Sequence, residues 1–119
     1  MDQLYVGSVV IDVNDLPEML SFWAGVLGYE HEHRGDDWVK LVDPNEKGVT
    51  VSLQKVPEPR TGKNRLHIDL YAGDRGAEVD RIVGMGAEVV REPGPDEDFV
   101  VLADPEGNLF CVIDQSDTG

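Results

Sequence analysis

The sequence contains very little cysteine and no long apolar run. Cys111 is the only cysteine and cannot form an internal disulfide, which agrees with a reducing compartment. Nowhere do about 18 apolar residues follow one another, as a membrane-spanning helix requires. The first residues, Met1 to Gln3, do not begin a basic segment followed by an apolar run, so no signal peptide is predicted. We therefore expect a cytoplasmic protein with no membrane partner.

Positive charge is also scarce. Only 10 Lys and Arg residues stand against 24 Asp and Glu residues, which gives a formal net charge of -14. Such a surface repels the phosphate backbone of nucleic acids and anionic lipid headgroups. We therefore expect no nucleic-acid partner, and we interpret the acidic surplus as a solvated surface that keeps the protein soluble.

The chain lacks a Pro-, Gly- or Ser-rich tract long enough to separate two domains. Its 119 residues, 40% of them hydrophobic and 29% charged, have the size and composition of one globular domain. We therefore expect a single domain covering residues 1–119.

What the sequence does contain is an internal repeat. The segment from Trp38 to Pro44 matches the segment from Phe99 to Pro105 position by position, including an aromatic residue and a final Asp-Pro turn. Residues 8–13 match residues 67–72 in the same way. Two similar halves follow, residues 4–57 and 64–114, joined by a loop.

Each half has the pattern of one strand, one helix and three further strands. Apolar residues alternate over 8–13 and 67–72, which is typical of half-buried strands. Helices are predicted from Asp15 to Gly28 and from Asp74 to Gly86, each begun by an Asp cap and ended by Gly. The further strands are predicted at 29–33 and 87–91, in the matched aromatic segments, and at 49–56 and 109–114. The fold class is therefore α+β, with the order βαβββ twice.

The helical periodicity also predicts which side chains are buried. The expected inward-facing residues are Leu16, Leu20, Trp23 and Leu27 in the first helix, and Val79, Ile82 and Val83 in the second.

Several short motifs, in this order and spacing, resemble a known superfamily. They are VNDL at 13–16, FW at 22–23, VLGY at 26–29, LHIDL at 66–70 and DPEGNLF at 104–110. Together they make the chain similar to glyoxalases, bleomycin-resistance proteins and extradiol dioxygenases, also called vicinal oxygen chelate proteins. The nearest variant is the small glyoxalase-like domain.

The resemblance implies two βαβββ modules whose sheets curl around a cup, often completed by a dimer. In metal-using relatives, the first and last strands of each module supply the ligands of one divalent ion. These positions fall at Ser8, Ser52, His67 and Cys111. Because only His67 is a ligand of the usual kind, we expect no cofactor and no metal.

Strand alternation predicts which residues line such a cup. The apolar alternation of the strands is expected to face the helices, and the intervening residues to face the concavity. A few convergent polar groups on an apolar wall are typical of small-molecule pockets. The candidate binding residues are Ser8, Asp12, Trp38, Ser52, Gln54, His67, Asp69, Tyr71 and Cys111.

His67 is the candidate catalytic residue, because an imidazole can donate, accept or move a proton near neutral pH. The alternative is a structural histidine bonded to a neighbour. Asp69, which corresponds to Asp12 in the repeat, is either a polarising carboxylate or a solvated one. Cys111 is interpreted as a small buried hydrophobic residue rather than a nucleophile.

An H-x-H pair occurs at His31 and His33. Alternate histidines of a strand share one face and can bind a metal ion. Because Glu30, Glu32 and Arg34 surround them, a solvated strand is favoured.

The leading hypothesis is a protein that binds a small organic molecule, either without chemistry or as a metal-independent enzyme of the glyoxalase type, a lyase or isomerase. One alternative is a metal-dependent lyase, isomerase or dioxygenase with His67 among the ligands. Another is a drug-sequestering protein, in which Trp38 and Tyr71 stack on a flat cationic ligand. We also expect a homodimer, because a partner would cover the free edges of the sheets.

Overall fold

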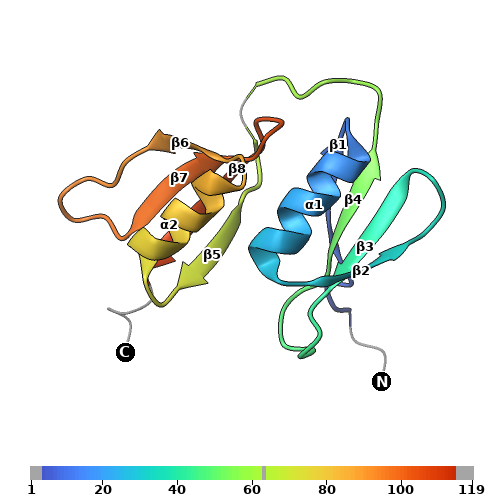
Figure 1. The fold of residues 1–119 in the computed structure, drawn as a ribbon, viewed down its shortest axis with the longest axis horizontal. Coiled ribbons are helices and arrows are strands. Elements are labelled where there is room, and N and C mark those ends of the chain that lie inside the picture. The colour runs from blue at the N-terminus through green and yellow to red at the C-terminus, as the bar shows by residue number, and fades with distance from the viewer. Residues whose placement is uncertain (1–3, 63, 115–119) are drawn as a thin grey trace. The chain divides into compact units, whose positions relative to one another are not determined.

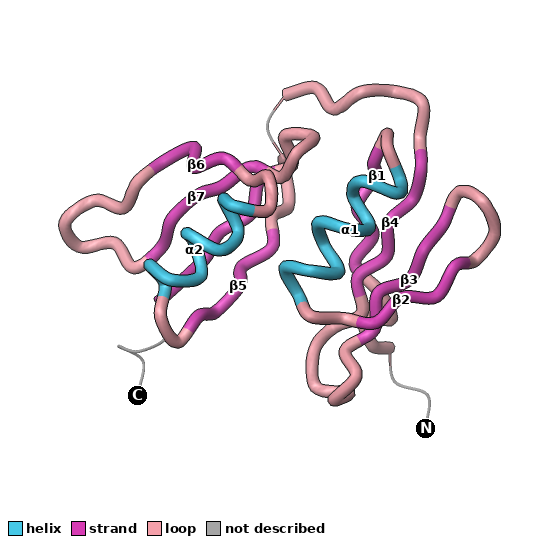
Figure 2. Tube along the Cα trace, viewed as in Figure 1, coloured by secondary structure: helices cyan, strands magenta, loops and turns pink. Residues whose placement is uncertain are grey.

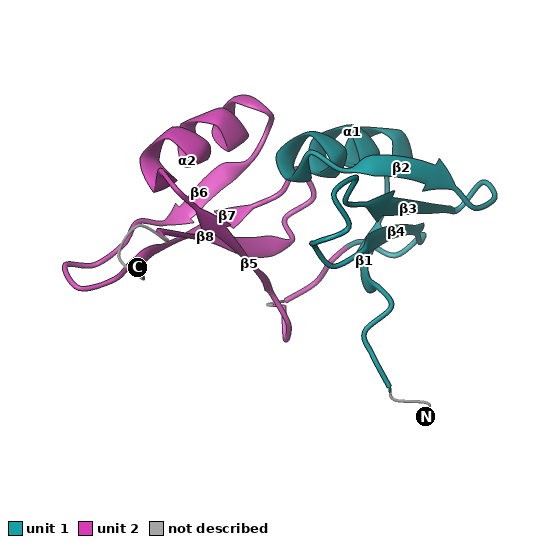
Figure 3. Ribbon diagram, turned by 90° about the horizontal axis from the view of Figure 1, so that it is seen from below, with its two compact units in different colours: residues 1–59 teal, residues 60–119 magenta. Residues whose placement is uncertain are grey.

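The computed structural model describes residues 4–62 and 64–114 (Figure 1). The chain forms two compact units, residues 1–59 and 60–119 (Figure 3). Each unit contains one strand, one helix and three further strands in the described part of the chain. Figure 2 shows where the helices and strands lie along the chain. The predicted α+β fold with two βαβββ halves is confirmed. None of the described helices is long and apolar enough to span a membrane.

The first unit is a four-stranded sheet with one helix on one face. Its strands lie in the order β1-β4-β3-β2, with β1 parallel to β4 and the other pairs antiparallel. The helix α1 packs against β3 and β4. The elements are β1 (Val9–Val13), α1 (Leu16–Leu27), β2 (Glu30–His33), β3 (Trp38–Val42) and β4 (Val51–Lys55).

The second unit repeats this topology. Its strands lie in the order β5-β8-β7-β6, with β5 parallel to β8, and α2 packs against β5 and β8. The elements are β5 (Ile68–Ala72), α2 (Arg75–Gly84), β6 (Glu88–Arg91), β7 (Phe99–Ala103) and β8 (Leu109–Asp114). In both units the strands differ from the predicted segments only at their ends.

Helix α1 begins and ends as its sequence predicts. The Asp15 carboxylate accepts a hydrogen bond from the Glu18 amide, and Gly28 ends the helix in the left-handed conformation. The predicted buried face was only partly right. Leu16 and Trp23 are buried, but Leu20 and Leu27 are half-buried. The helix is turned so that its buried face also includes Met19, Phe22 and Val26.

Helix α2 is shorter than predicted and covers its sheet with fewer side chains. Asp74 caps its first turn by accepting from the Ala77 amide, and Ile82 is its buried residue. Val79 is half-buried and Val83 is exposed, so the prediction that Val83 faces inward was wrong. Val83 follows Ile82 by one residue, about 100° further around the helix, so it points away from the sheet when Ile82 faces it.

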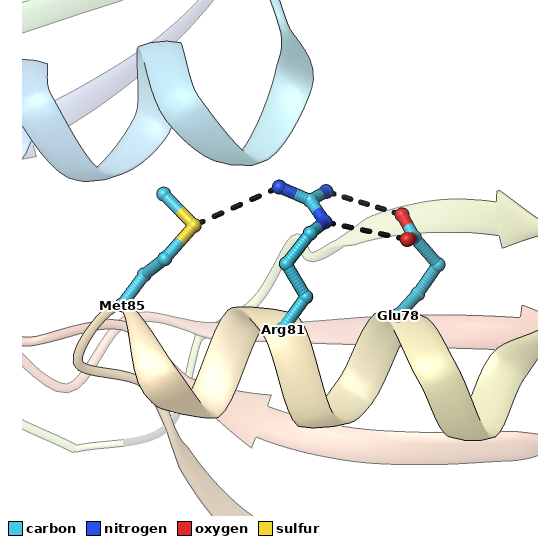
Figure 4. A network of polar contacts seen from close by, with 3 residues as sticks. All are labelled: Glu78, Arg81 and Met85. Atoms are coloured by element: carbon cyan, nitrogen blue, oxygen red, sulfur yellow. Dashed lines mark hydrogen bonds and ion pairs between the residues drawn. The ribbon is translucent and has the colours of Figure 1, made fainter.

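The exposed side of α2 carries a small polar network (Figure 4). The Arg81 guanidinium donates to Glu78 at 3.1 Å, one turn before it, and to the Met85 sulfur at 3.7 Å, one turn after it. An ion pair of the Glu78–Arg81 kind on a helix surface contributes about 0.2–0.5 kcal/mol. This pair therefore offsets part of the low helix propensity of Gly76 and Gly84.

The repeated Asp-Pro segments form the turns that precede β4 and β8. In the first turn the Asp43 carboxylate accepts from the amides of Asn45, Lys47 and Gly48. These bonds, the one from Asn45 foremost, lower the pKa of Asp43. In the second turn the buried Asp104 accepts from the amides of Glu106 and Asn108. In both units, therefore, the Asp carboxylate that begins the turn accepts hydrogen bonds from the amides two and four residues later.

Candidate ligand-binding site

The register of β5 and β8 separates the side chains of the second sheet into two faces. Ile68 pairs with Phe110 and Leu70 pairs with Val112. Phe110 and Val112 are almost fully buried, on the face against which α2 packs. The intervening residues lie on the other face, which we call the site face. It contains Asp69 beside Cys111 and Tyr71 beside Ile113, as the strand alternation predicted.

Three groups capable of chemistry meet on this face. The ligand atoms of His67, Asp69 and Cys111 all lie within 4.8 Å of one another. Nε2 of His67 lies 3.2 Å from Oδ1 of Asp69, and both side chains are about half exposed, at 55% and 44%. A proton on Nε2 would be donated to the carboxylate, which leaves Nδ1 as a hydrogen-bond acceptor.

Cys111 differs from its two neighbours because it is only 8% exposed. Burial raises the pKa of the Cys111 thiol, and the nearby Asp69 carboxylate raises it further, while Arg91 acts in the opposite direction. The thiol is therefore protonated near neutral pH. This environment favours a space-filling role over a nucleophilic one.

Arg91 also lies on the site face, and the sequence analysis missed it. A bulge between Val89 and Arg91 pairs Arg91 with Val101, the neighbour of Cys111 on β7. Regular alternation would have put Val90 there instead, and no residue pattern in the sequence marked the bulge. The guanidinium lies 5.2 Å from the centre of the Phe99 ring and donates twice to Glu97, at 2.7 and 2.9 Å.

Glu97 holds Arg91 in this position. Its carboxylate also accepts from the Gly94 amide at 2.7 Å. The hydrogen bond from Arg91, and then the one from Gly94, lower the pKa of Glu97. The pair therefore stays charged near neutral pH and orders the segment between β6 and β7 beside the site face.

The candidate residues of the first unit lie on the corresponding face of its sheet. Asp12 pairs with Gln54, and Gln54 pairs with Trp38, so these three form one row across β1, β4 and β3. The Ser8 and Ser52 hydroxyls are 2.7 Å apart, and Ser52 is only 2% exposed. Each unit thus brings its opening-strand position close to its closing-strand position. The expectation that both faces line one cup stays a prediction.

Of the four positions that the resemblance assigns to a divalent ion, three carry residues that are poor metal ligands. Ser8 and Ser52 are neutral hydroxyls that hydrogen-bond to each other. Cys111 has a raised pKa, and a thiol must lose its proton to bind a metal well. His67 alone is a strong ligand at neutral pH, and Asp69 adds a carboxylate outside the inherited set.

Comparison with known proteins agrees with the fold. A family model described as Glyoxalase-like domain matches residues 8–113. A search of curated proteins gives no significant match. Solved structures superimpose over most of the chain. One is a glyoxalase/bleomycin resistance protein/dioxygenase family enzyme from Burkholderia phytofirmans, with TM-score 0.75, 18% identity, and coverage of 92% of this chain and 97% of that chain.

Two further structures show how varied the proteins with this fold are. A glyoxalase/bleomycin resistance protein from Albidiferax ferrireducens has TM-score 0.68, 22% identity, and coverage of 91% of this chain and 96% of that chain. A mutant of the fosfomycin resistance protein FosX from Listeria monocytogenes, complexed with Mn(II) and a dihydroxypropylphosphonic acid, has TM-score 0.74 and 16% identity. This alignment covers 95% of this chain and 90% of that chain. At such identities the likeness establishes the fold alone.

Proposed function

The chain belongs to the family of glyoxalase-like domains, and from this premise we propose that it binds a small organic molecule on the site face of its second sheet. The observation that carries the proposal is the meeting of His67, Asp69 and Cys111 within 4.8 Å. His67 and Asp69 are polar and half exposed, so a ligand can reach them. Cys111 and Ile113 add an apolar wall beside them.

Each residue of this group has a distinct role in the proposal. The Asp69 carboxylate orients the imidazole through Nε2, so that Nδ1 accepts a hydrogen bond from a hydroxyl or amide of the ligand. Tyr71 and Phe99 lie in the next row of the sheet, joined through Ile113, and supply aromatic surface for the apolar part of the ligand. Arg91 is committed to Glu97 and shapes the border of the site.

Proton transfer is a second candidate function, favoured by the contact between His67 and Asp69. A carboxylate beside an imidazole stabilises the imidazolium that forms when Nδ1 takes a proton. In that case His67 is the general base of a metal-independent lyase or isomerase, and it returns the proton to the same substrate. A metal-dependent reaction is disfavoured by the poor ligand set.

Sequestration of a flat cationic drug is the remaining candidate, favoured by the row that contains Trp38 in the first unit. Trp38 is half-buried, and Asp12 lies two strands away in the same row. An indole face near a carboxylate suits a flat cation. Such a ligand would bind without turnover.

Two expectations about the whole protein remain part of this proposal. The edge strand β1 and the segment before the edge strand β5 carry exposed apolar residues, among them Val10 and Leu66, which a second copy of the chain would cover in a homodimer. A cytoplasmic location agrees with the single cysteine.

A fragment screen by thermal shift tests the proposal. Fragments that stabilise the native protein are tested again on Asp69→Asn and, as a matched control on the first unit, on Asp12→Asn. We expect the stabilisation to shrink in Asp69→Asn and to persist in Asp12→Asn. Hits that stabilise Asp69→Asn as much as the native protein, but not Asp12→Asn, would move the binding site to the first sheet.

A further inference from the structure

A second cluster of potential ligands, the H-x-H pair of the sequence, lies on β2 of the first unit, apart from the candidate ligand-binding residues. His31 and His33 occupy alternate positions of this strand, and they pair with Leu41 and Val39 of β3. Their side chains therefore leave the same face of the strand. The two ring centres are 5.7 Å apart, the ring planes are nearly perpendicular at 86°, and both residues are exposed.

The surroundings leave this pair accessible to an ion. β2 is an edge strand in the order β1-β4-β3-β2, so one side of it is not covered by another strand of its sheet. Glu30 and Glu32 alternate with the histidines and lie on the opposite face. Arg34, the nearest cation in the sequence, forms an ion pair with Glu32 at 3.1 Å. The Arg34 guanidinium is thus held beside Glu32, on the face of β2 opposite to His31 and His33.

We propose that His31 and His33 together bind a divalent transition-metal ion of the Ni²⁺, Cu²⁺ or Zn²⁺ kind. Neutral imidazole is a preferred ligand for these three ions. Each nitrogen binds at about 2 Å from the ion, so the rings must approach slightly from 5.7 Å, which exposed side chains achieve by small rotations about χ1 and χ2. Water fills the remaining coordination positions.

This site is independent of the proposed ligand-binding function. His31 and His33 belong to the first unit, and the candidate site face belongs to the second. The acidic surface attracts all cations, but Mg²⁺ and Ca²⁺ prefer oxygen ligands. Binding of Ni²⁺ or Cu²⁺ in the presence of a large excess of Mg²⁺ would therefore distinguish imidazole ligands from surface carboxylates.

The test uses the full chain without an affinity tag. Because the sequence contains only three histidines, the ring Hε1 protons give three assignable proton NMR signals, one for each histidine. A small amount of Cu²⁺ should broaden the His31 and His33 signals together. Calorimetric titration with Ni²⁺ should then show a loss of at least about tenfold in affinity in His31→Asn and in His33→Asn, because each loses the second linked ligand.

A parity control separates a paired site from the mere number of histidines. His33→Asn combined with Glu32→His keeps three histidines but places two of them on opposite faces of β2. We expect this variant to bind Ni²⁺ as weakly as His33→Asn. All altered positions are exposed, and unchanged melting temperatures verify the fold. Native affinity in the parity variant, or broadening confined to His67, would overturn the proposal.

Discussion

At the scale of single residues, the environments of His67 and Cys111 predict unequal roles. His67 is half exposed and touches Asp69, whereas Cys111 is buried with a raised pKa. The side chain that can form hydrogen bonds with a ligand is therefore the imidazole. The thiol mainly fills space.

A matched pair of variants tests this difference. For a ligand found by screening, His67→Ala should weaken binding by about tenfold to a hundredfold, since loss of its hydrogen bonds costs about 1–3 kcal/mol. Cys111→Ser should change affinity far less. Melting curves first establish that both variants are folded, and calorimetry measures the affinities. If the native protein and His67→Ala bind the ligand with equal affinity, His67 does not contact the ligand and has only a structural role.

Gly48 is a second residue whose importance lies in its surroundings. A Cβ at this position would collide with the Tyr29 hydroxyl and crowd the Asp43 carboxylate. Partial burial of Tyr29 raises the pKa of its hydroxyl, and the charge of Asp43 raises it further, which indicates close packing. Gly48 therefore allows the β3–β4 turn to approach Tyr29, which lies between α1 and β2.

Gly48→Ala should accordingly destabilise the fold by about 1–3 kcal/mol, the usual range for overpacking. Gly84→Ala is the control, because a Cβ at Gly84 meets no atom within 4 Å and alanine favours the helix. Urea denaturation of both variants measures the free energy of unfolding. Equal stability of Gly48→Ala and the native protein would show that Tyr29 moves aside without cost.

At the scale of elements, the turn between β3 and β4 is an acid-sensitive structure. Amide hydrogen bonds to the Asp43 carboxylate lower its pKa from the usual value of 3.8. A group with a lowered folded pKa stabilises the fold above its unfolded pKa, and this contribution is lost as the pH falls through the folded value. The turn should therefore weaken below about pH 4.

Asp43→Asn tests this pH dependence. An amide accepts fewer and weaker hydrogen bonds than a carboxylate, so we expect a lower melting temperature than that of the native protein at pH 7. The difference should narrow as the pH falls below the usual Asp pKa, because protonation then favours the unfolded chain, in which the pKa of Asp43 is higher than in the folded protein. Thermal melts from pH 7 to pH 3 measure it, and a constant difference over this range would exclude the Asp43 contribution.

At the scale of the whole molecule, the poor metal ligands at Ser8, Ser52 and Cys111 predict that a chelator does not change the thermal stability. The positions that hold a metal in relatives include two hydroxyls that bond to each other and a buried protonated thiol. EDTA should therefore leave the melting temperature nearly unchanged, because an ion held at these positions by His67 and a thiol would add little stability. A fall of many degrees that Zn²⁺ or Ni²⁺ reverses, and that disappears in His67→Ala, would establish a metal at the group of His67, Asp69 and Cys111.

The sheet edges predict the oligomeric state. Exposed apolar residues on and before β1 and before β5, such as Tyr5, Val10 and Leu66, are costly to leave in water. We expect light scattering to give the mass of a homodimer at micromolar concentration. A strictly monomeric mass at moderate salt would show that a dimer does not cover these residues.

The sequence by itself determined the features that depend on local pattern. The Asp15 and Asp74 caps, the Asp43 and Asp104 turns and the strand alternation that puts Asp69 beside Cys111 all follow from spacing along the chain. The internal repeat supported the βαβββ order of both halves, because two segments with the same sequence pattern are expected to fold with the same topology.

Only the tertiary structure decided the features that depend on packing between distant segments. The rotation of α1 that buries Met19 depends on the shape of the sheet beneath it, which periodicity along the helix does not specify. The bulge that turns Arg91 toward Val101 arises from pairing between β6 and β7, and the Ser8–Ser52 contact joins two strands far apart in the sequence. Each of these features depends on strand pairing or side-chain burial between distant segments, and such contacts form only when the chain folds.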